Sequence, residues 1–117
     1  MATFSKVKLS NSTSGRGIKV AATATAGTAI HTAVAGASDI DEIWIYAVNS
    51  SAADVTLTLE WGGVTNPDDN ISVTVKAYGG LTLIAPGLLL NGALSLAAFA
   101  GTTNVIVIFG YVNRITA

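Results

Sequence analysis

Apolar and polar residues alternate one by one along two stretches of this chain, residues 55–61 and 71–76. A period of two places successive side chains on opposite faces of a β-strand, so both stretches are predicted to be strands with one face in water. Two further stretches, 43–48 and 105–109, are apolar on both faces. They are predicted to be central strands whose two sides are covered by a second sheet, a neighbouring subunit or an arm.

Turn-forming residues recur between these stretches at the spacing of a β-sandwich. They are Asn49-Ser50-Ser51, Gly62-Gly63 with Asn66-Pro67-Asp68-Asp69, Gly79-Gly80, Pro86-Gly87, Asn91-Gly92 and Gly101-Thr102-Thr103-Asn104. The strands predicted between them are 18–24, 28–34, 42–49, 54–61, 71–77, 81–85, 93–99 and 104–112. The Ala-rich stretch 20–27 has helix propensity, but its alternating Thr residues and closing Gly favour a strand. The fold class is therefore all-β, a jelly-roll-like β-sandwich.

The first sixteen residues have no core face of their own, because Ser, Thr and Asn dominate them. The chain is predicted to divide into an extended N-terminal arm, residues 1–16, and a single sandwich domain, residues 17–117. The arm is expected to be poorly ordered in isolation and to dock on an acidic surface of a partner or a neighbouring copy. Its candidate contact residues, taken with the first basic residue of the domain, are Phe4, Lys6, Val7, Lys8, Leu9, Arg16 and Lys19.

The composition excludes several classes of protein. With 50% hydrophobic residues the chain of 117 residues is not disordered, and with six basic against seven acidic residues it is not a dedicated duplex DNA binder. Residues 77–113 carry no charge, but Pro86-Gly87 and Asn91-Gly92 interrupt them before a membrane span is reached. Neither nucleic acid nor membrane is therefore an expected partner. The apolar surplus favours a homo-oligomer instead.

His31 is the single histidine, so a Ser-His-Asp arrangement would need it, with Ser10, Ser38 or Ser50 as nucleophile and Asp39 as orienting carboxylate. None of these serines lies in a Gly-x-Ser-x-Gly motif. A structural histidine, hydrogen-bonded locally or at a subunit contact, is the favoured interpretation. No catalytic residue is assigned, and the protein is not expected to be an enzyme.

Clustered acidic residues raise the question of calcium, because Asp39-Ile40-Asp41-Glu42 and Asp68-Asp69 offer carboxylate oxygens. Without an Asp-x-Asp-x-Asp-Gly loop, a solvated loop is favoured. No Cys and one His leave no zinc-like spacing, and no phosphate-binding loop is present, so no metal or cofactor is predicted.

Aromatic residues are the remaining candidates for chemistry. Trp44, Tyr46, Trp61, Tyr78 and Tyr111 could form a platform that stacks on sugars, but aromatic residues are also ordinary core and interface residues of β-proteins. Core or interface roles are favoured for Trp44, Tyr46 and Trp61, and for Ile108.

Five segments together carry a resemblance to a known group of proteins. They are Ile30-His31-Thr32-Ala33, residues 41–49 (DEIWIYAVN), residues 59–63 (LEWGG), residues 86–92 (PGLLLNG) and residues 110–115 (GYVNRI). With these segments the chain resembles small virion proteins of tailed bacteriophages, in particular capsid decoration, or cement, proteins.

The resemblance implies a non-enzymatic structural protein that binds and stabilises the capsid shell. Its partner would be the phage major capsid protein, its own assembly a homo-oligomer, in particular a trimer, and its location the virion, assembled in the host cytoplasm. A tail- or fibre-associated carbohydrate-binding module is the alternative.

Overall fold

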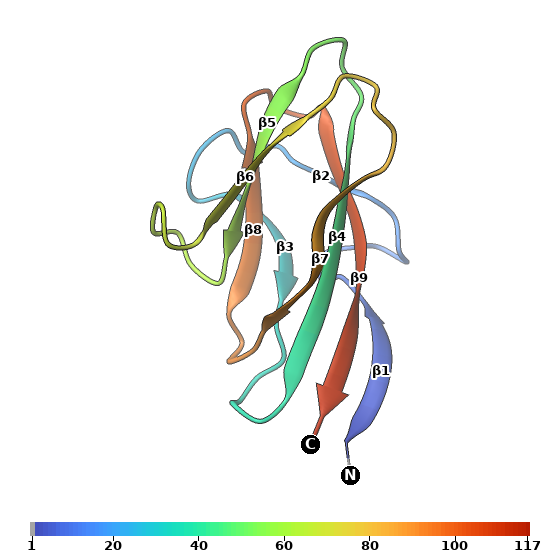
Figure 1. Ribbon diagram of the computed structural model, residues 1–117, viewed down its shortest axis with the longest axis vertical. Helices are drawn as coiled ribbons and strands as arrows, with labels where there is room; N and C mark the ends of the chain where they lie inside the picture. Colours follow the sequence, from blue (N-terminus) through green and yellow to red (C-terminus); the bar gives the residue numbers. More distant parts are fainter. Residues whose placement is uncertain (1) are drawn as a thin grey trace.

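The computed structural model describes residues 2–117, which form nine strands in two antiparallel sheets packed face to face (Figure 1). The all-β sandwich predicted from the alternation is confirmed. Sheet A has the order β1 (Thr3–Lys8), β9 (Ile106–Thr116), β4 (Ile40–Asn49) and β7 (Thr82–Leu90), with β2 (Ile18–Lys19) also on β9. Sheet B has the order β3 (Thr28–Thr32), β8 (Ser95–Ala100), β5 (Val55–Trp61) and β6 (Asn70–Val75). No helix of residues 2–117 is long and apolar enough to cross a membrane.

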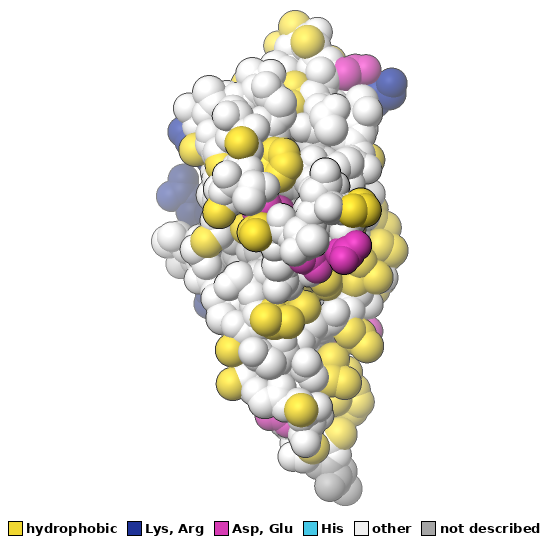
Figure 2. Space-filling view, turned by 90° about the vertical axis from the view of Figure 1, so that its left-hand side faces the viewer, with side chains coloured by type: hydrophobic (Ala, Val, Ile, Leu, Met, Phe, Trp, Pro, Cys, Tyr) yellow, Lys and Arg dark blue, Asp and Glu magenta, His cyan; other side chains and the backbone are white. Residues whose placement is uncertain are grey.

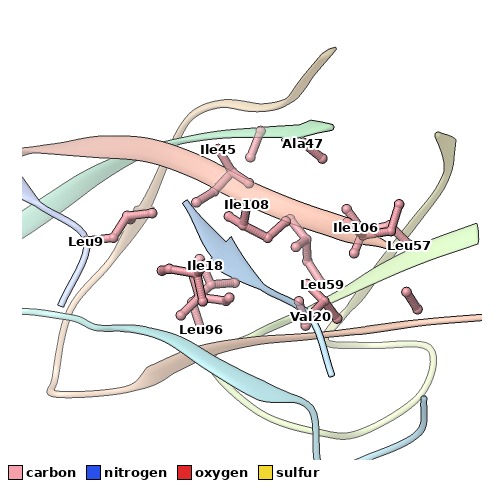
Figure 3. Packing of buried hydrophobic residues seen from close by; sticks show 14 of the residues in the cluster. Leu9, Ile18, Val20, Ile45, Ala47, Leu57, Leu59, Leu96, Ile106 and Ile108 are labelled. Carbon is pink, nitrogen blue, oxygen red and sulfur yellow. The ribbon is translucent and has the colours of Figure 1, made fainter. Parts of the chain in front are cut away.

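The core lies between the two sheets and follows the period of two. In β4 the buried positions alternate with half-buried ones, and the buried residues Ile43, Ile45 and Ala47 face sheet B. Figure 3 shows Ile45 and Ile108 from sheet A among Leu57 and Leu59 from sheet B. All are fully buried. The sheets therefore stabilise each other mainly through the apolar area that they remove from water.

The two stretches that are apolar on both faces form β4 and β9, the inner strands of sheet A. Sheet B covers their inner faces, as the pattern predicted. Their outer faces stay half-buried within the single chain, from Trp44 to Val48 in β4 and from Val107 to Tyr111 in β9. The second cover that the pattern implied is therefore not part of this chain.

The N-terminal segment is extended but belongs to the domain's own sheet. β1 pairs antiparallel with β9, from Thr3 opposite Thr116 to Lys8 opposite Tyr111, so the two chain ends lie side by side (Figure 1). Leu9 follows with 2% of its surface exposed and packs in the core. This differs from the expected poorly ordered arm, because the alternation in residues 3–9 finds a strand partner within the chain.

The Ala-rich stretch is a second difference, since the strand predicted over 18–24 ends at Lys19. The following residues cross from sheet A to sheet B, where a carboxylate holds them. Glu60 accepts hydrogen bonds from Thr25 Oγ1 and from the Gly27 N–H, both at 2.7 Å. A Cβ on Gly27 would lie 2.6 Å from the backbone of Ala98, so only glycine allows this approach.

A third difference concerns Pro86-Gly87, which was predicted to be a turn but lies inside β7. The pairing of β7 with β4 shifts register between Ile43 and Trp44 and again between Ile45 and Tyr46. Gly87 has a φ of +77°, which glycine adopts without strain. Proline is tolerated here because β7 is an edge strand, where a missing N–H costs no ladder hydrogen bond.

Candidate functional site

The outer face of sheet A leaves three large apolar side chains exposed, those of Phe4, Leu83 and Leu89. We call this surface the docking face. It is formed by Phe4, Lys6 and Lys8 of β1, Val107, Phe109, Tyr111, Asn113 and Ile115 of β9, Ile40, Glu42, Trp44, Tyr46 and Val48 of β4, and Leu83, Pro86 and Leu89 of β7. Phe4 and Leu89, near two opposite margins, are 72% and 56% exposed. Apolar and aromatic residues make up most of this face, and a mainly apolar face is typical of an interaction surface.

Aromatic rings form a ladder across the middle of the docking face. Lys6 Nζ lies 4.8 Å from the ring centre of Tyr111, and the Tyr111 ring is nearly parallel to that of Trp44, with centres 6.1 Å apart. A Cβ on Gly87 would lie 3.1 to 3.3 Å from three adjacent atoms of the Trp44 ring, so the other side of this indole covers Gly87. The ladder therefore runs from β1 through β9 and β4 to β7.

Glu42, two residues before Trp44 on the docking face, holds the Trp44 ring in place. Its Oε1 accepts hydrogen bonds from Trp44 Nε1 at 3.0 Å and from Asn113 Nδ2 at 2.8 Å. The hydrogen bonds from Asn113 and Trp44 hold the pKa of Glu42 below its usual range, so the carboxylate stays ionised. The indole is thus oriented before any partner binds.

The five aromatic residues singled out in the sequence do not form one platform. Trp44, Tyr46 and Tyr111 lie on the docking face, whereas Trp61 packs against the core and donates from Nε1 to the Leu89 carbonyl at 3.2 Å. Tyr78 follows β6 on the other sheet. A sugar-binding platform needs free ring faces, and those of Trp44 are taken by Tyr111 and Gly87.

A buried ionic cluster joins the two sheets at the end where the termini lie. Asp41 of β4 is fully buried and receives Arg114 Nε at 2.7 Å and Nη2 at 3.0 Å from β9. Its Oδ2 also contacts His31 Nε2 of β3 at 2.8 Å. Burial opposes ionisation of Asp41, but the hydrogen bonds from Arg114 and His31 and the charge of Arg114 hold its pKa below the usual range. The same contact raises the pKa of Arg114.

His31 extends this cluster to the N-terminal segment. Its Nδ1 accepts a hydrogen bond from the Ser10 main-chain N–H at 2.9 Å, which assigns the proton of a neutral ring to Nε2, facing Asp41. The register shift between Ala29 and His31 turns His31 inward beside the buried Ile30. Asp41 thus holds His31, and His31 holds the segment that follows β1.

Ser10, His31 and Asp41 stand in the order of a catalytic triad, with Ser10 Oγ 2.9 Å from Nδ1. Nδ1 already receives the main-chain N–H of the same serine, so it can accept the hydroxyl proton only by giving up that bond. The orienting carboxylate expected from the sequence was Asp39, but Asp39 accepts the Ala117 N–H instead. Asp41, His31 and Ser10 thus tie the segment after β1 to the domain, and we call these three residues the clasp.

The acidic residues weighed as a calcium site point to different partners. Asp39, Asp41 and Glu42 contact Ala117, Arg114 and Asn113 respectively. Asp69 accepts the Thr65 N–H in the hairpin between β5 and β6. Over residues 2–117 no three His, Cys, Asp or Glu side chains converge as a metal site.

The predicted contact residues of the N-terminal segment lie in different parts of the structure. Phe4, Lys6 and Lys8 lie on the docking face, while Val7 packs against the core that contains Leu9. Arg16 is exposed and lines an open cleft of about 460 Å³ beside Phe109. Lys19 is exposed opposite Val107. The buried Asp41 and the half-buried Arg114, whose pairing the sequence did not predict, hold this region to the domain.

Comparison of the chain with protein-family models, with curated protein sequences and with solved structures gave no match.

Proposed function

We propose that this chain is a non-enzymatic structural protein of a tailed-phage virion, which binds the capsid shell as a decoration protein through the docking face. Its partner in this proposal is the major capsid protein. The observation that carries the proposal is the uncovered apolar face on β4 and β9, the strands whose sequence is apolar on both sides. Interfaces of structural proteins draw their affinity from such surfaces.

The distribution of apolar side chains supports the choice of sheet A over sheet B. Figure 2 looks at the side of the molecule formed by sheet B, where most of the surface is neither apolar nor charged. Hydrophobic side chains gather along its lower right-hand margin, on the side that faces the viewer in Figure 1. β7, with the exposed Leu83, Leu88 and Leu89, forms the edge of sheet A.

The docking face is preformed, which favours binding. Glu42 orients the indole of Trp44, and the clasp of Asp41 and His31 ties down the segment after β1. A surface ordered in advance loses less conformational entropy on association. A decoration protein then stabilises the shell by mass action, because it binds the mature shell more tightly than the expanded or broken state, and this difference is multiplied over many sites.

The topology supports a jelly-roll-like arrangement as part of this proposal. From β2 to β9 the chain passes between the two sheets at every connection except the β5–β6 hairpin. Eight strands arranged in two sheets are typical of jelly rolls. Self-association also belongs to the proposal, and its trimeric order comes from the resemblance alone.

Two measurements test the proposal. Cryo-electron microscopy of the virion that carries this chain should find it on the outer surface of the shell, and a position on the tail or a fibre would contradict capsid decoration. Binding to shells that lack the protein should fall at least tenfold for a Phe4→Glu, Leu89→Glu variant. The matched control, Thr56→Glu with Ser95→Glu, places the same charges at exposed positions of sheet B. Equal losses in both variants would refute the docking face.

A further inference from the structure

The sandwich has four edges, formed by β1 with β2 and by β7 in sheet A and by β3 and β6 in sheet B. Three of these edges carry features that discourage pairing with another chain. β1 places Lys6 and Lys8 on its edge, and β7 contains Pro86-Gly87 and two register shifts. β3 has five residues and a register shift between Ala29 and His31. Charges, proline, bulges and short length are the usual protections of an open edge.

The fourth edge strand, β6, has none of these protections. Its sequence Asn-Ile-Ser-Val-Thr-Val contains no charge, proline or glycine. It pairs with β5 without a register shift through six consecutive residue pairs. A regular, uncharged edge strand of this kind is a template for an added strand.

The main-chain groups that β6 offers can be assigned from the ladder. The Trp61 N–H donates to the Asp69 carbonyl at 2.8 Å, so the hydrogen-bonded pairs continue at every second residue, with Ile71, Val73 and Val75 facing β5. The N–H and C=O groups of Ser72 and Thr74 therefore point away from β5, as does the carbonyl of Asn70. Sheet B ends at β6, so the chain itself supplies no strand on that side.

We propose that β6 pairs antiparallel with β6 of a second copy of this chain, about a two-fold axis at Ser72, to form one continuous eight-stranded sheet. This register is the one that uses all three open positions. It places Ser72 opposite Ser72 of the second copy and Asn70 opposite Thr74 of the second copy. A two-fold axis makes the contact self-complementary and closed.

Charge at the two ends of β6 supports the second copy as the occupant. Asp68 and Asp69 precede the strand, and Lys76 follows it with 75% of its side chain exposed. In the Ser72 register Lys76 lies opposite Asp68 of the second copy, and the symmetry gives this pair twice. Lys76 also contacts Asp54 at 3.3 Å, a surface pair that binds weakly and leaves the lysine available.

An exposed apolar residue lies beyond each end of β6, so that the antiparallel register brings the two kinds of end together. Val64, before the strand, is 52% exposed, and Tyr78, after it, is 71% exposed. The antiparallel register brings the end that carries Tyr78 beside the end that carries Val64 of the second copy. The half-buried Ile71 and Val73 would also gain cover.

This dimer contact lies on sheet B and is independent of the docking face on sheet A, so one chain can make both contacts at once. It goes beyond the proposed capsid role and does not rest on it, and it replaces the trimeric order that the resemblance implies with a dimer. The strand pair is a small interface, so we expect a dissociation constant in the micromolar range.

Sedimentation velocity of the full chain between 1 and about 200 µM tests the pairing. The expected result is a concentration-dependent species of twice the 11.8 kDa chain mass. A monomer throughout, or a trimer, would overturn the proposal. Ser72→Pro removes the central outward N–H in both copies while the ladder to β5 keeps its donors, and it should abolish dimerisation with the circular dichroism spectrum unchanged.

Charge variants keep the test decisive if the proline variant unfolds. Lys76→Asp should weaken dimerisation about tenfold, because two favourable pairs become repulsive. Adding Asp68→Lys should restore the wild-type constant to within about threefold. The matched control, Lys8→Asp, makes the same charge change on the edge of sheet A and should have no effect. Dimerisation that is insensitive to Lys76→Asp, or equally sensitive to Lys8→Asp, would place the contact elsewhere.

Discussion

The two sheets share one core but differ on their outer faces. The outer face of sheet A presents aromatic rings and leucines, whereas the outward positions of β5 and β6 hold Thr56, Thr58, Ser72 and Thr74, with Thr58 and Ser72 hydrogen-bonded at 2.9 Å. Residues 25–27 of the same chain cover the outer face of sheet B at Glu60. The chain thus covers part of the outer face of sheet B itself, whereas the cover of the outer face of sheet A is the partner that we propose.

The two buried carboxylates, Asp41 and Glu60, also differ in the face that they point to and in their partners. Asp41 points into the sandwich and is neutralised by Arg114 and contacted by His31, whereas Glu60 points outward and accepts only from neutral groups of the 25–27 segment. Each holds down a segment that follows a strand of sheet A. The inward Asp41 has a charged partner, while Glu60, on the outer face of sheet B, is satisfied by hydroxyl and main-chain donors alone.

The largest expected effect is the difference in lost stability between a substitution on the inner side of β4 and one on its outer side. Ile45→Ala removes a fully buried side chain and should lower the free energy of unfolding by about 2–5 kcal/mol. Tyr46→Ala, one residue on but on the docking face, should cost under about 1.5 kcal/mol, because its ring is half-buried. Urea denaturation measures both. Equal losses would mean that the two faces of β4 are equally packed.

The next largest effect should come from the inward carboxylate. Asp41→Asn leaves Arg114 and His31 without their anionic partner and should lower the free energy of unfolding by about 3 kcal/mol. Urea denaturation at neutral pH checks the loss, and Asp39→Asn, at the half-buried neighbouring aspartate that contacts Ala117, is the control with a smaller expected loss.

The pH dependence gives an independent measure of the same contact. Because the pKa of folded Asp41 lies below its unfolded value of about 3.9, its stabilisation is present above that pH and is lost as the pH falls through the folded pKa. Asp41→Asn should therefore flatten the loss of stability below about pH 4. The acid dependence that remains belongs in part to Glu42 and Asp54, whose pKa values are also lowered. An unchanged acid profile in the variant would contradict the ionised Asp41.

The outward carboxylate should give a smaller effect. Glu60→Ala leaves Thr25 Oγ1 and the Gly27 N–H without an acceptor and should cost about 1–3 kcal/mol. Glu60→Gln keeps one acceptor oxygen and should cost less. Hydrogen exchange at the Gly27 amide should accelerate in the alanine variant before that of Leu57 does, because the segment opens before the sheet. Simultaneous acceleration would show that the segment and the sheet unfold together.

The smallest effect concerns the ladder on the docking face. Lys6→Ala should cost about 0.5–1 kcal/mol by removing the cation over the Tyr111 ring, and Tyr111→Leu should remove that difference in a double-mutant cycle. Lys8→Ala is the control on the same strand. A coupling energy of zero between Lys6 and Tyr111 would show that the contact does not contribute to stability.

The alternation predicted most strands to within a few residues, since β5 and β6 occupy 55–61 and 70–75 where 54–61 and 71–77 were expected. The strand and turn predictions were wrong where tertiary contacts override local propensity. Residues 20–24 alternate like a strand, but the chain there must cross between sheets. Pro86-Gly87 has the chemistry of a turn, yet an edge strand accepts both residues as a bulge.

The candidate site was predictable only in part. Trp44 and Tyr46 were identified as core or interface residues, and the structure places them on the docking face. Asp41 could have been noticed, because it has the same parity in β4 as the buried Ile43 and Ile45. Its partners lie 10 residues away at His31 and 73 residues away at Arg114, and a period of two does not specify which strands become neighbours.

The sequence by itself determined the period of two, and with it the class of fold, the inner face of each strand and the apolar character of both faces of β4 and β9. Only the tertiary structure decided which of those faces is covered. Side-chain direction is local and follows from the backbone geometry of a strand, whereas strand order and the cover of a sheet depend on contacts between residues far apart in the chain. The docking face, the clasp at Asp41 and the open edge of β6 all follow from strand order.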